Sequence, residues 1–346
     1  MESKKNTGFW FLFFAVLLVV LFLTNLWYGS VLISWQEVWA ALTNSNETAK
    51  AAQIIVQEYR LPQTVTALAV GMALGIAGLL LQTLFRNPLA GPSVLGISSG
   101  ASLGVAIVVL LGGAFQIQWP ESLKIMSELS IVLMAFAGSL LVLGIILFVS
   151  GRIANIVTVL IIGIMIGYAV SAVVGVLQYF SRSTELHAYV IWGLGSFSNT
   201  NTDQSTFLFI ATLTGVLFSL LFMRQLNALL LGDNYARSLG VNTKQTQFIL
   251  ILVSGFLIAL ATAFTGPIAF VGLAVPHLAR SFYRTSNHRV LLPAVILMGG
   301  VLTLFCNLIA KLPGYDISLP INAVTSIIGA PIVVWVIVKR GRVKKS

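Results

Sequence analysis

Apolar runs long enough to cross a lipid bilayer recur along almost the whole sequence of 346 residues. One membrane helix needs about 20 such residues to cross a hydrocarbon core of about 30 Å. The runs predict an all-α, polytopic membrane protein of about ten transmembrane helices, in a single transmembrane domain that covers 1–346. They lie at 9–29, 61–81, 93–112, 127–149, 155–179, 206–223, 246–265, 267–282, 290–309 and 320–338.

The scarcity of charge supports this interpretation. Only 9% of the residues are charged and 58% are hydrophobic, whereas a soluble domain has about 25% charged residues. The lipid bilayer is therefore the expected solvent. The net charge of +10 comes from basic residues that lie between the apolar runs, so we expect no nucleic-acid partner. The run at 9–29 is too long for a signal peptide and is expected to be the first membrane helix.

The distribution of basic residues predicts the topology. With both termini in the cytoplasm, 15 of the 20 Lys and Arg residues fall on the inner side and 5 on the outer side. Cytoplasmic loops carry such an excess of Lys and Arg. An odd number of spans would break this pattern.

Several function classes lack their characteristic residues. No Asp or Glu lies near the middle of a run, which argues against a proton-coupled secondary carrier. The sequence has no G-x-x-x-x-G-K-[ST] motif, so energy from ATP must come from another subunit. It also shows no catalytic triad pattern, H-E-x-x-H motif or Cys/His cluster. We therefore expect no catalytic or metal-binding residues, although a secondary carrier or channel and an intramembrane enzyme remain alternatives at this point.

Glycines at four-residue spacing recur in the apolar runs. Gly71 and Gly75 form one stripe, Gly96, Gly100 and Gly104 a second, and Gly163 and Gly167 a third. In lipid, such stripes allow helix backbones to approach closely. They indicate tight helix packing more than a ligand site.

The longest inner loop, 225–245, contains a segment that can form a short helix. Asp233 to Leu239 is the predicted helix, and Gly240 would stop it. A short amphipathic helix with little core to join needs a partner surface or the lipid interface. Because its basic face is weak, we favour a partner protein. The predicted contact set is Gly232, Asp233, Ala236, Arg237, Ser238, Leu239 and Gly240.

Two further groups of residues are candidates on the outer side and along a pathway. Arg60 precedes Pro62 at the predicted outer start of the second span, where it would be either an interfacial anchor or a docking residue. A wide pathway would need small and polar side chains, although helix packing or loop solvation is the favoured explanation of each one individually. The pathway candidates are Ser98, Ser99, Ser102, Ser171, Gln178, Ser196 and Asn199.

Five motifs in order give the sequence a family resemblance. They are Arg60-Leu61-Pro62; Asn87-Pro88-Leu89-Ala90 with Leu95-Gly96-Ile97-Ser98-Ser99-Gly100; Ala236-Arg237-Ser238-Leu239-Gly240; Gly266-Pro267-Ile268-Ala269-Phe270-Val271-Gly272-Leu273 with Val275-Pro276-His277; and Leu319-Pro320 with Gly329-Ala330-Pro331. Together they resemble the FecCD-like permeases, the transmembrane subunits of type II ABC importers for ferric siderophores, haem or vitamin B12.

The resemblance implies partners and roles. A second permease, identical or related, would complete a central pathway in the bacterial cytoplasmic membrane. Two cytoplasmic ATPase subunits would bind ATP and Mg, this chain would bind no cofactor, and an external substrate-binding protein would deliver the cargo. The segment from Gly232 to Gly240 would couple to the ATPase, and Arg60 and Lys311 would dock the binding protein. An iron-siderophore complex is the expected cargo, with haem or vitamin B12 as the alternative.

The sequence departs from the family pattern at two positions. Lys311 stands where the family often has Arg, and Gly91 where it often has an acid. Lysine cannot make the bidentate contact of an arginine.

Overall fold

The chain forms helices throughout the parts that the structure describes. The computed structural model describes residues 2–43, 50–111, 124–153, 155–311 and 318–343, and none of these lies in a strand. The chain divides into two compact units that alternate along the sequence. Unit 1 comprises Met1–Ile76, Ser196–Leu220 and Ala269–Ser346, and unit 2 comprises Ala77–Gly195 and Leu221–Ile268.

Unit 1 is built around a long N-terminal helix. It contains α1 (Glu2–Trp27), α2 (Trp35–Leu42), α3 (Lys50–Ile54), the π-helix η1 (Ile55–Arg60), the first part of α4 (Leu61–Leu84), α10 (Thr202–Leu220), α14 (Val271–Tyr283), α15 (His288–Ala310) and α16 (Ile321–Val343). Helix α1 packs along α15. Near its start the Trp10 ring lies 4.9 Å from that of Phe282, and near its end Asn25 donates to the Leu304 carbonyl.

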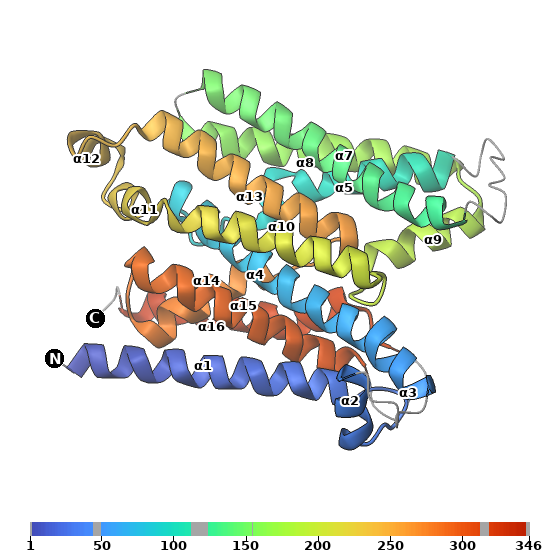
Figure 1. Cartoon of the computed structure of the whole chain (residues 1–346). Coiled ribbons are helices and arrows are strands. Elements are labelled where there is room, and N and C mark those ends of the chain that lie inside the picture. The colour runs from blue at the N-terminus through green and yellow to red at the C-terminus, as the bar shows by residue number, and fades with distance from the viewer. Residues whose placement is uncertain (1, 44–49, 112–123, 154, 312–317, 344–346) are drawn as a thin grey trace. The chain divides into compact units, whose positions relative to one another are not determined.

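These contacts fix the direction of the helices in unit 1. Helices α1 and α15 run the same way, and the bond from Leu319 N to Ala310 O (2.8 Å) places the start of α16 at the end of α15. Helix α16 therefore returns toward the start of α1, and both ends of the chain lie at the same end of this unit (Figure 1). An even number of crossings requires this arrangement, while the side of the membrane stays a prediction.

Unit 2 is organised around a short central helix. It contains the end of α4, the 3₁₀ turn η2 (Pro92–Leu95), α5 (Ile97–Ala106), the π-helix η3 (Ile107–Leu111), α7 (Lys124–Arg152), α8 (Ile156–Phe180), α9 (Ser183–Gly193), α11 (Met223–Leu229), α12 (Asp233–Ser238) and α13 (Thr243–Thr265). Helix α5 packs against α7, α8 and α13. In Figure 1, α11 and α12 lie at one end of α13.

Glycine allows the helices of each unit to approach at backbone distance. A Cβ on Gly100 of α5 would collide with the Gly138 carbonyl oxygen of α7, and a Cβ on Gly71 of α4 would collide with the Gly299 carbonyl of α15. The predicted packing role of the glycine stripes is therefore confirmed at these crossings.

The crossing of α5 and α7 gives a first prediction. Gly100→Ala should destabilise the protein by about 1–3 kcal/mol, because a rigid carbonyl rather than a flexible side chain occupies the space that the methyl needs. Gly144→Ala on α7 is the matched control, since no atom lies within 4 Å of its added Cβ. Thermal unfolding of the detergent-solubilised variants measures the difference. Equal melting temperatures for the two variants would contradict the packing role.

Each of the ten predicted runs contains a helix. Seven helical stretches in the described residues are long and apolar enough to cross a membrane, and Ile97–Leu111 and Ile321–Val336 are shorter apolar helices. A polytopic all-α fold is therefore confirmed, whereas the count of ten and the single domain stay predictions. The seventh and eighth runs form two separate helices, because α13 ends at Thr265 and α14 begins at Val271.

Two boundaries differ from the prediction, and one helix is additional. The second span was predicted to begin at 61, but helical backbone already begins at Lys50 and continues through the π-helix Ile55–Arg60 into α4. The third helix begins at Ile97 and not at 93, because Pro92–Leu95 form a separate 3₁₀ turn. The loop after the first span also contains α2, whose start is fixed by a capping box between Ser34 and Glu37.

Candidate functional site

The predicted short helix of the inner loop is present as α12, Asp233–Ser238. Two backbone bonds close its end: Gly240 N donates to Arg237 O (2.9 Å), and Val241 N donates to Ala236 O (3.0 Å). Gly240 has φ +79°, the left-handed conformation that this motif requires. The predicted stop at Gly240 is therefore confirmed.

Apolar side chains in and beside α12 are uncovered. Leu239 follows Tyr235 by four residues, so these two lie on the same side of the helical turn, and Leu231 lies just before the helix. Leu231, Tyr235 and Leu239 are 64%, 52% and 58% exposed, whereas Ala236 is fully buried. We call Leu231, Tyr235 and Leu239 the apolar stripe. Only Leu239 belonged to the predicted contact set, although the four-residue spacing was visible in the sequence.

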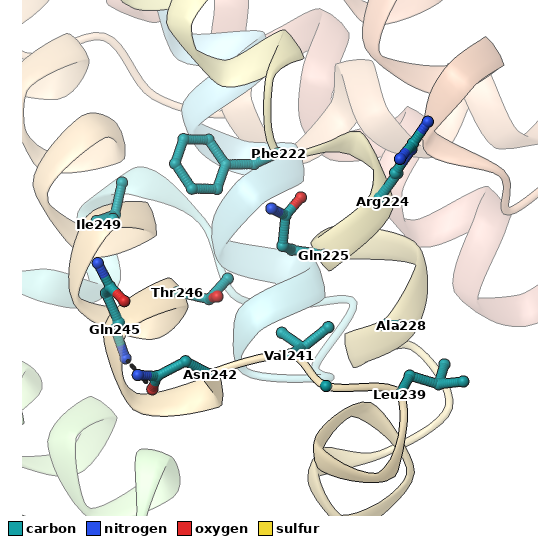
Figure 2. A pocket seen from close by; sticks show the side chains of 11 residues that line it. Phe222, Arg224, Gln225, Ala228, Leu239, Val241, Asn242, Gln245, Thr246 and Ile249 are labelled. Carbon is teal, nitrogen blue, oxygen red and sulfur yellow. Dashed lines mark hydrogen bonds between the residues drawn. The ribbon is translucent and has the colours of Figure 1, made fainter.

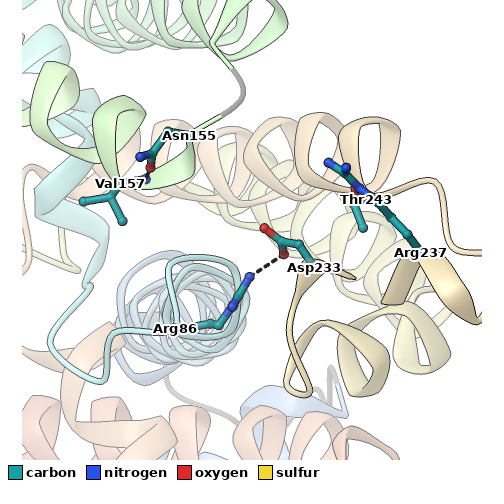
Figure 3. A network of polar contacts seen from close by, with 6 residues as sticks. All are labelled: Arg86, Asn155, Val157, Asp233, Arg237 and Thr243. Atoms are coloured by element: carbon teal, nitrogen blue, oxygen red, sulfur yellow. Dashed lines mark hydrogen bonds and ion pairs between the residues drawn. The ribbon is translucent and has the colours of Figure 1, made fainter. Parts of the chain in front are cut away.

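Polar contacts attach both ends of α12 to the rest of unit 2 (Figure 3). Asp233, in the first turn, forms an ion pair of 2.5 Å with Arg86, which follows α4. Arg237, in the last turn, donates from Nε to the hydroxyl of Thr243 at the start of α13 (3.0 Å). Asp233 and Arg237 are therefore engaged within the chain, and the exposed apolar stripe is open to a partner.

A cavity of about 540 Å³ lies beside α12, between α11 and α13 (Figure 2). Phe222 and Gln225 line it from the α11 side, Thr246 and Ile249 from α13, and the turn 239–242 closes it. Gln225 Oε1 is buried and accepts no hydrogen bond from the residues that the structure describes. The cavity can thus receive an apolar side chain of a partner.

Arg60 is buried and not at the outer surface where the sequence placed it. Only 5% of the residue is exposed. Its guanidinium donates to the carbonyls of Leu26 (3.0 Å) and Trp27 (2.6 Å) and to that of Val31. The last carbonyls of a helix have no intrahelical donors, and positive charge is favourable there. Arg60 therefore closes the C-terminal end of α1.

Lys311 is buried in the same region, with 8% exposed. It follows the span His288–Ala310, and its Nζ donates to the Asn25 carbonyl (2.7 Å). Asn307 donates to the Asn25 side chain (2.8 Å) and accepts from Gln63 (3.2 Å). Both predicted docking cations are thus bonded to their own chain, and their docking role stays a prediction.

The burial of Lys311 predicts that the protein becomes more stable as the pH rises above about 7. Burial, together with the charge of Arg60, lowers the pKa of Lys311 from 10.5 to about 7. Between these values the unfolded chain binds more protons than the folded one, so the free energy of unfolding should rise with pH, by at most about 1.4 kcal/mol per pH unit. Unfolding at about pH 7.5 and about pH 9.5, compared with Lys311→Met, isolates this contribution. Parallel curves for the two proteins would contradict it.

The predicted pathway residues are divided between the two units. Ser98, Ser99, Ser102, Ser171 and Gln178 belong to unit 2, whereas Ser196 and Asn199 belong to unit 1. Ser98 lies 3.3 Å from the Thr262 hydroxyl, and Ser102 is hydrogen-bonded to Tyr189, so both serve helix packing. Ser171 and Asn199 are exposed, and Ser99, Gln178 and Ser196 are partly exposed. Their pathway role stays a prediction.

Comparison with known proteins identifies the family. The model of the FecCD transport family matches residues 17–339. The chain belongs to the FecCD transport family. It is 37% identical over 333 residues to the hemin transport system permease protein HmuU of Yersinia pestis, which covers 95% of both chains. It is 33% identical over 341 residues to the vitamin B12 import system permease protein BtuC of Escherichia coli, covering 99% of this chain and 98% of BtuC.

Solved structures agree with the family. An inward-facing structure described as a metal-chelate type ABC transporter matches with a TM-score of 0.82 and 28% identity, over 95% of this chain and 98% of that one. PsaBC from Streptococcus pneumoniae shares the fold, with a TM-score of 0.52 and 16% identity. This FecCD protein is therefore a multi-pass membrane permease subunit of an ABC importer.

Proposed function

We propose that this FecCD permease carries a ferric siderophore across the bacterial cytoplasmic membrane, driven by ATPase subunits on the inner side. A second permease, identical or related, would complete the pathway, and an external binding protein would deliver the cargo. ATP and Mg²⁺ would bind to the ATPase subunits, and this chain would bind no cofactor.

The exposed apolar stripe at α12 is the observation that supports the proposal. Its two ends are bonded to α4 and α13 of the same unit, while its apolar stripe is exposed beside a cavity. A stable monomer rarely leaves such a feature uncovered unless a partner occupies it. Because the sequence has no P-loop, the partner that fits is the subunit that hydrolyses ATP.

Haem and vitamin B12 are the alternative cargoes, with about equal support. The relatives HmuU and BtuC are named for hemin and vitamin B12, and the structural neighbour for a metal chelate. All three cargo classes are bulky chelates of one metal ion. Selectivity among them is expected to rest mainly on the external binding protein.

Reconstitution tests the proposal. The chain should be purified with the ATPase and binding protein encoded beside it, placed in liposomes, and given a ferric siderophore, haem or cyanocobalamin in separate arms. ATP-dependent uptake of the siderophore alone supports the proposal, whereas uptake of haem or cobalamin supports the alternative. Uptake that needs no ATPase and stops with an uncoupler would instead show a secondary carrier and overturn the proposal.

A further inference from the structure

Arg86 has an uncommon backbone conformation at the end of α4. Arg86 N donates to Thr83 O and Asn87 N donates to Gln82 O, both at 3.2 Å, which is the bonding of a Schellman motif. The residue at this place takes a left-handed conformation, and Arg86 has φ +47°. Glycine is the usual residue there, because a side chain is disfavoured at positive φ. Ending α4 therefore does not require arginine.

The side chain of Arg86 connects α4 to α12. Its guanidinium lies 2.5 Å from the Asp233 carboxylate and beside Gly232, the residue that precedes α12 (Figure 3). The two side chains are 43% and 31% exposed. Such an exposed ion pair contributes little to stability. Residues with strained backbone, such as Arg86, concentrate at functional sites. We therefore look for the role of this ion pair in the two elements that it connects and not in its contribution to stability.

Helix α12 has few other means of moving the membrane helices. Its fully buried side chain is Ala236, and the apolar side chains in and beside it, Leu231, Tyr235 and Leu239, are exposed. The bond from Arg237 to Thr243 connects its other end to α13. A displacement of α12 can therefore reach α4 through Arg86 and α13 through Thr243.

We propose that the Arg86–Asp233 ion pair is a coupling strut, which transmits movements of α12 to the inner end of α4. Arg86 is then a positioning residue for transport. The inference rests on the proposed function, because the force on α12 comes from the ATPase partner.

Two single variants and one double variant test the strut in the reconstituted importer. Arg86→Gly removes the guanidinium and suits the left-handed backbone, so its melting temperature should not fall. Cargo-stimulated ATP hydrolysis should nevertheless drop about fivefold in Arg86→Gly and in Asp233→Arg. The double variant Arg86→Asp with Asp233→Arg restores an ion pair of reversed polarity and should recover to within about twofold of the unsubstituted protein.

Lys244→Glu is the matched control. Lys244 is exposed on the same inner loop and outside the ion pair, so a general charge effect would appear there too. Unchanged stimulation in both single variants, or a double variant no better than Asp233→Arg, would overturn the strut. Failure of the proposed function is a different result, because the unsubstituted chain would then recover no ATPase and show no ATP-dependent uptake.

Discussion

Replacing Gly240 with proline is expected to abolish ATP-driven uptake. Proline fixes φ near −65°, whereas Gly240 has φ +79°. Proline also has no N–H, so the 2.9 Å bond to Arg237 O is lost. The combined penalty of about 3 kcal/mol or more exceeds what the packing of a six-residue helix can offset, and α12 should unfold. The loss in uptake should be at least about hundredfold, since 1.4 kcal/mol corresponds to tenfold.

Gly240→Asn is the matched control for this result. Asparagine tolerates the left-handed conformation and keeps the N–H, so uptake should stay within about threefold of the unsubstituted protein. Uptake should be measured in liposomes at equal amounts of inserted protein. If Gly240→Pro transports as well as Gly240→Asn, α12 does not couple to the ATPase.

The features that could be predicted from the sequence depend on local signals. The α12 helix and its stop need only the residues from Asp233 to Gly240, and the close helix crossings follow from glycine spacing. The apolar runs predict helices because a bilayer imposes their length. The missed helix α2 also had a local signal, since Ser34 and Glu37 match the capping box pattern.

The contacts that could not be predicted join distant residues. Arg60 donates to carbonyls 29 to 34 residues earlier. Because every residue has a backbone carbonyl, the sequence does not show which of them will accept a hydrogen bond. Arg86 and Asp233 lie in loops that are far apart in the sequence, and neither loop contains a signal for the other. A charged residue next to an apolar run is predicted to lie at the surface. Only the structure shows that the end of α1 and the residues after it cover Arg60.

The burial of Arg60 leads to the second large prediction. Arg60→Glu would replace a donor of three hydrogen bonds by a carboxylate facing the carbonyls of Leu26, Trp27 and Val31. The three carbonyls lose their donor and the buried carboxylate faces acceptors only, which together cost about 3–5 kcal/mol. The melting temperature of the solubilised protein should fall by roughly 5–10 °C. Arg182→Glu, at an exposed arginine, is the matched control and should leave it nearly unchanged.

The same variant separates the two roles considered for Arg60. A docking residue would lower the affinity for the binding protein while the melting temperature stayed constant, and the loss would be larger at low salt. A residue that closes the end of α1 would lower the melting temperature first, and any loss of affinity would follow the unfolded fraction. Measuring both quantities on one preparation therefore decides between them. Because the three carbonyls already occupy the guanidinium, we expect the loss of stability, and an Arg60→Glu protein that melts like the unsubstituted one would contradict this interpretation.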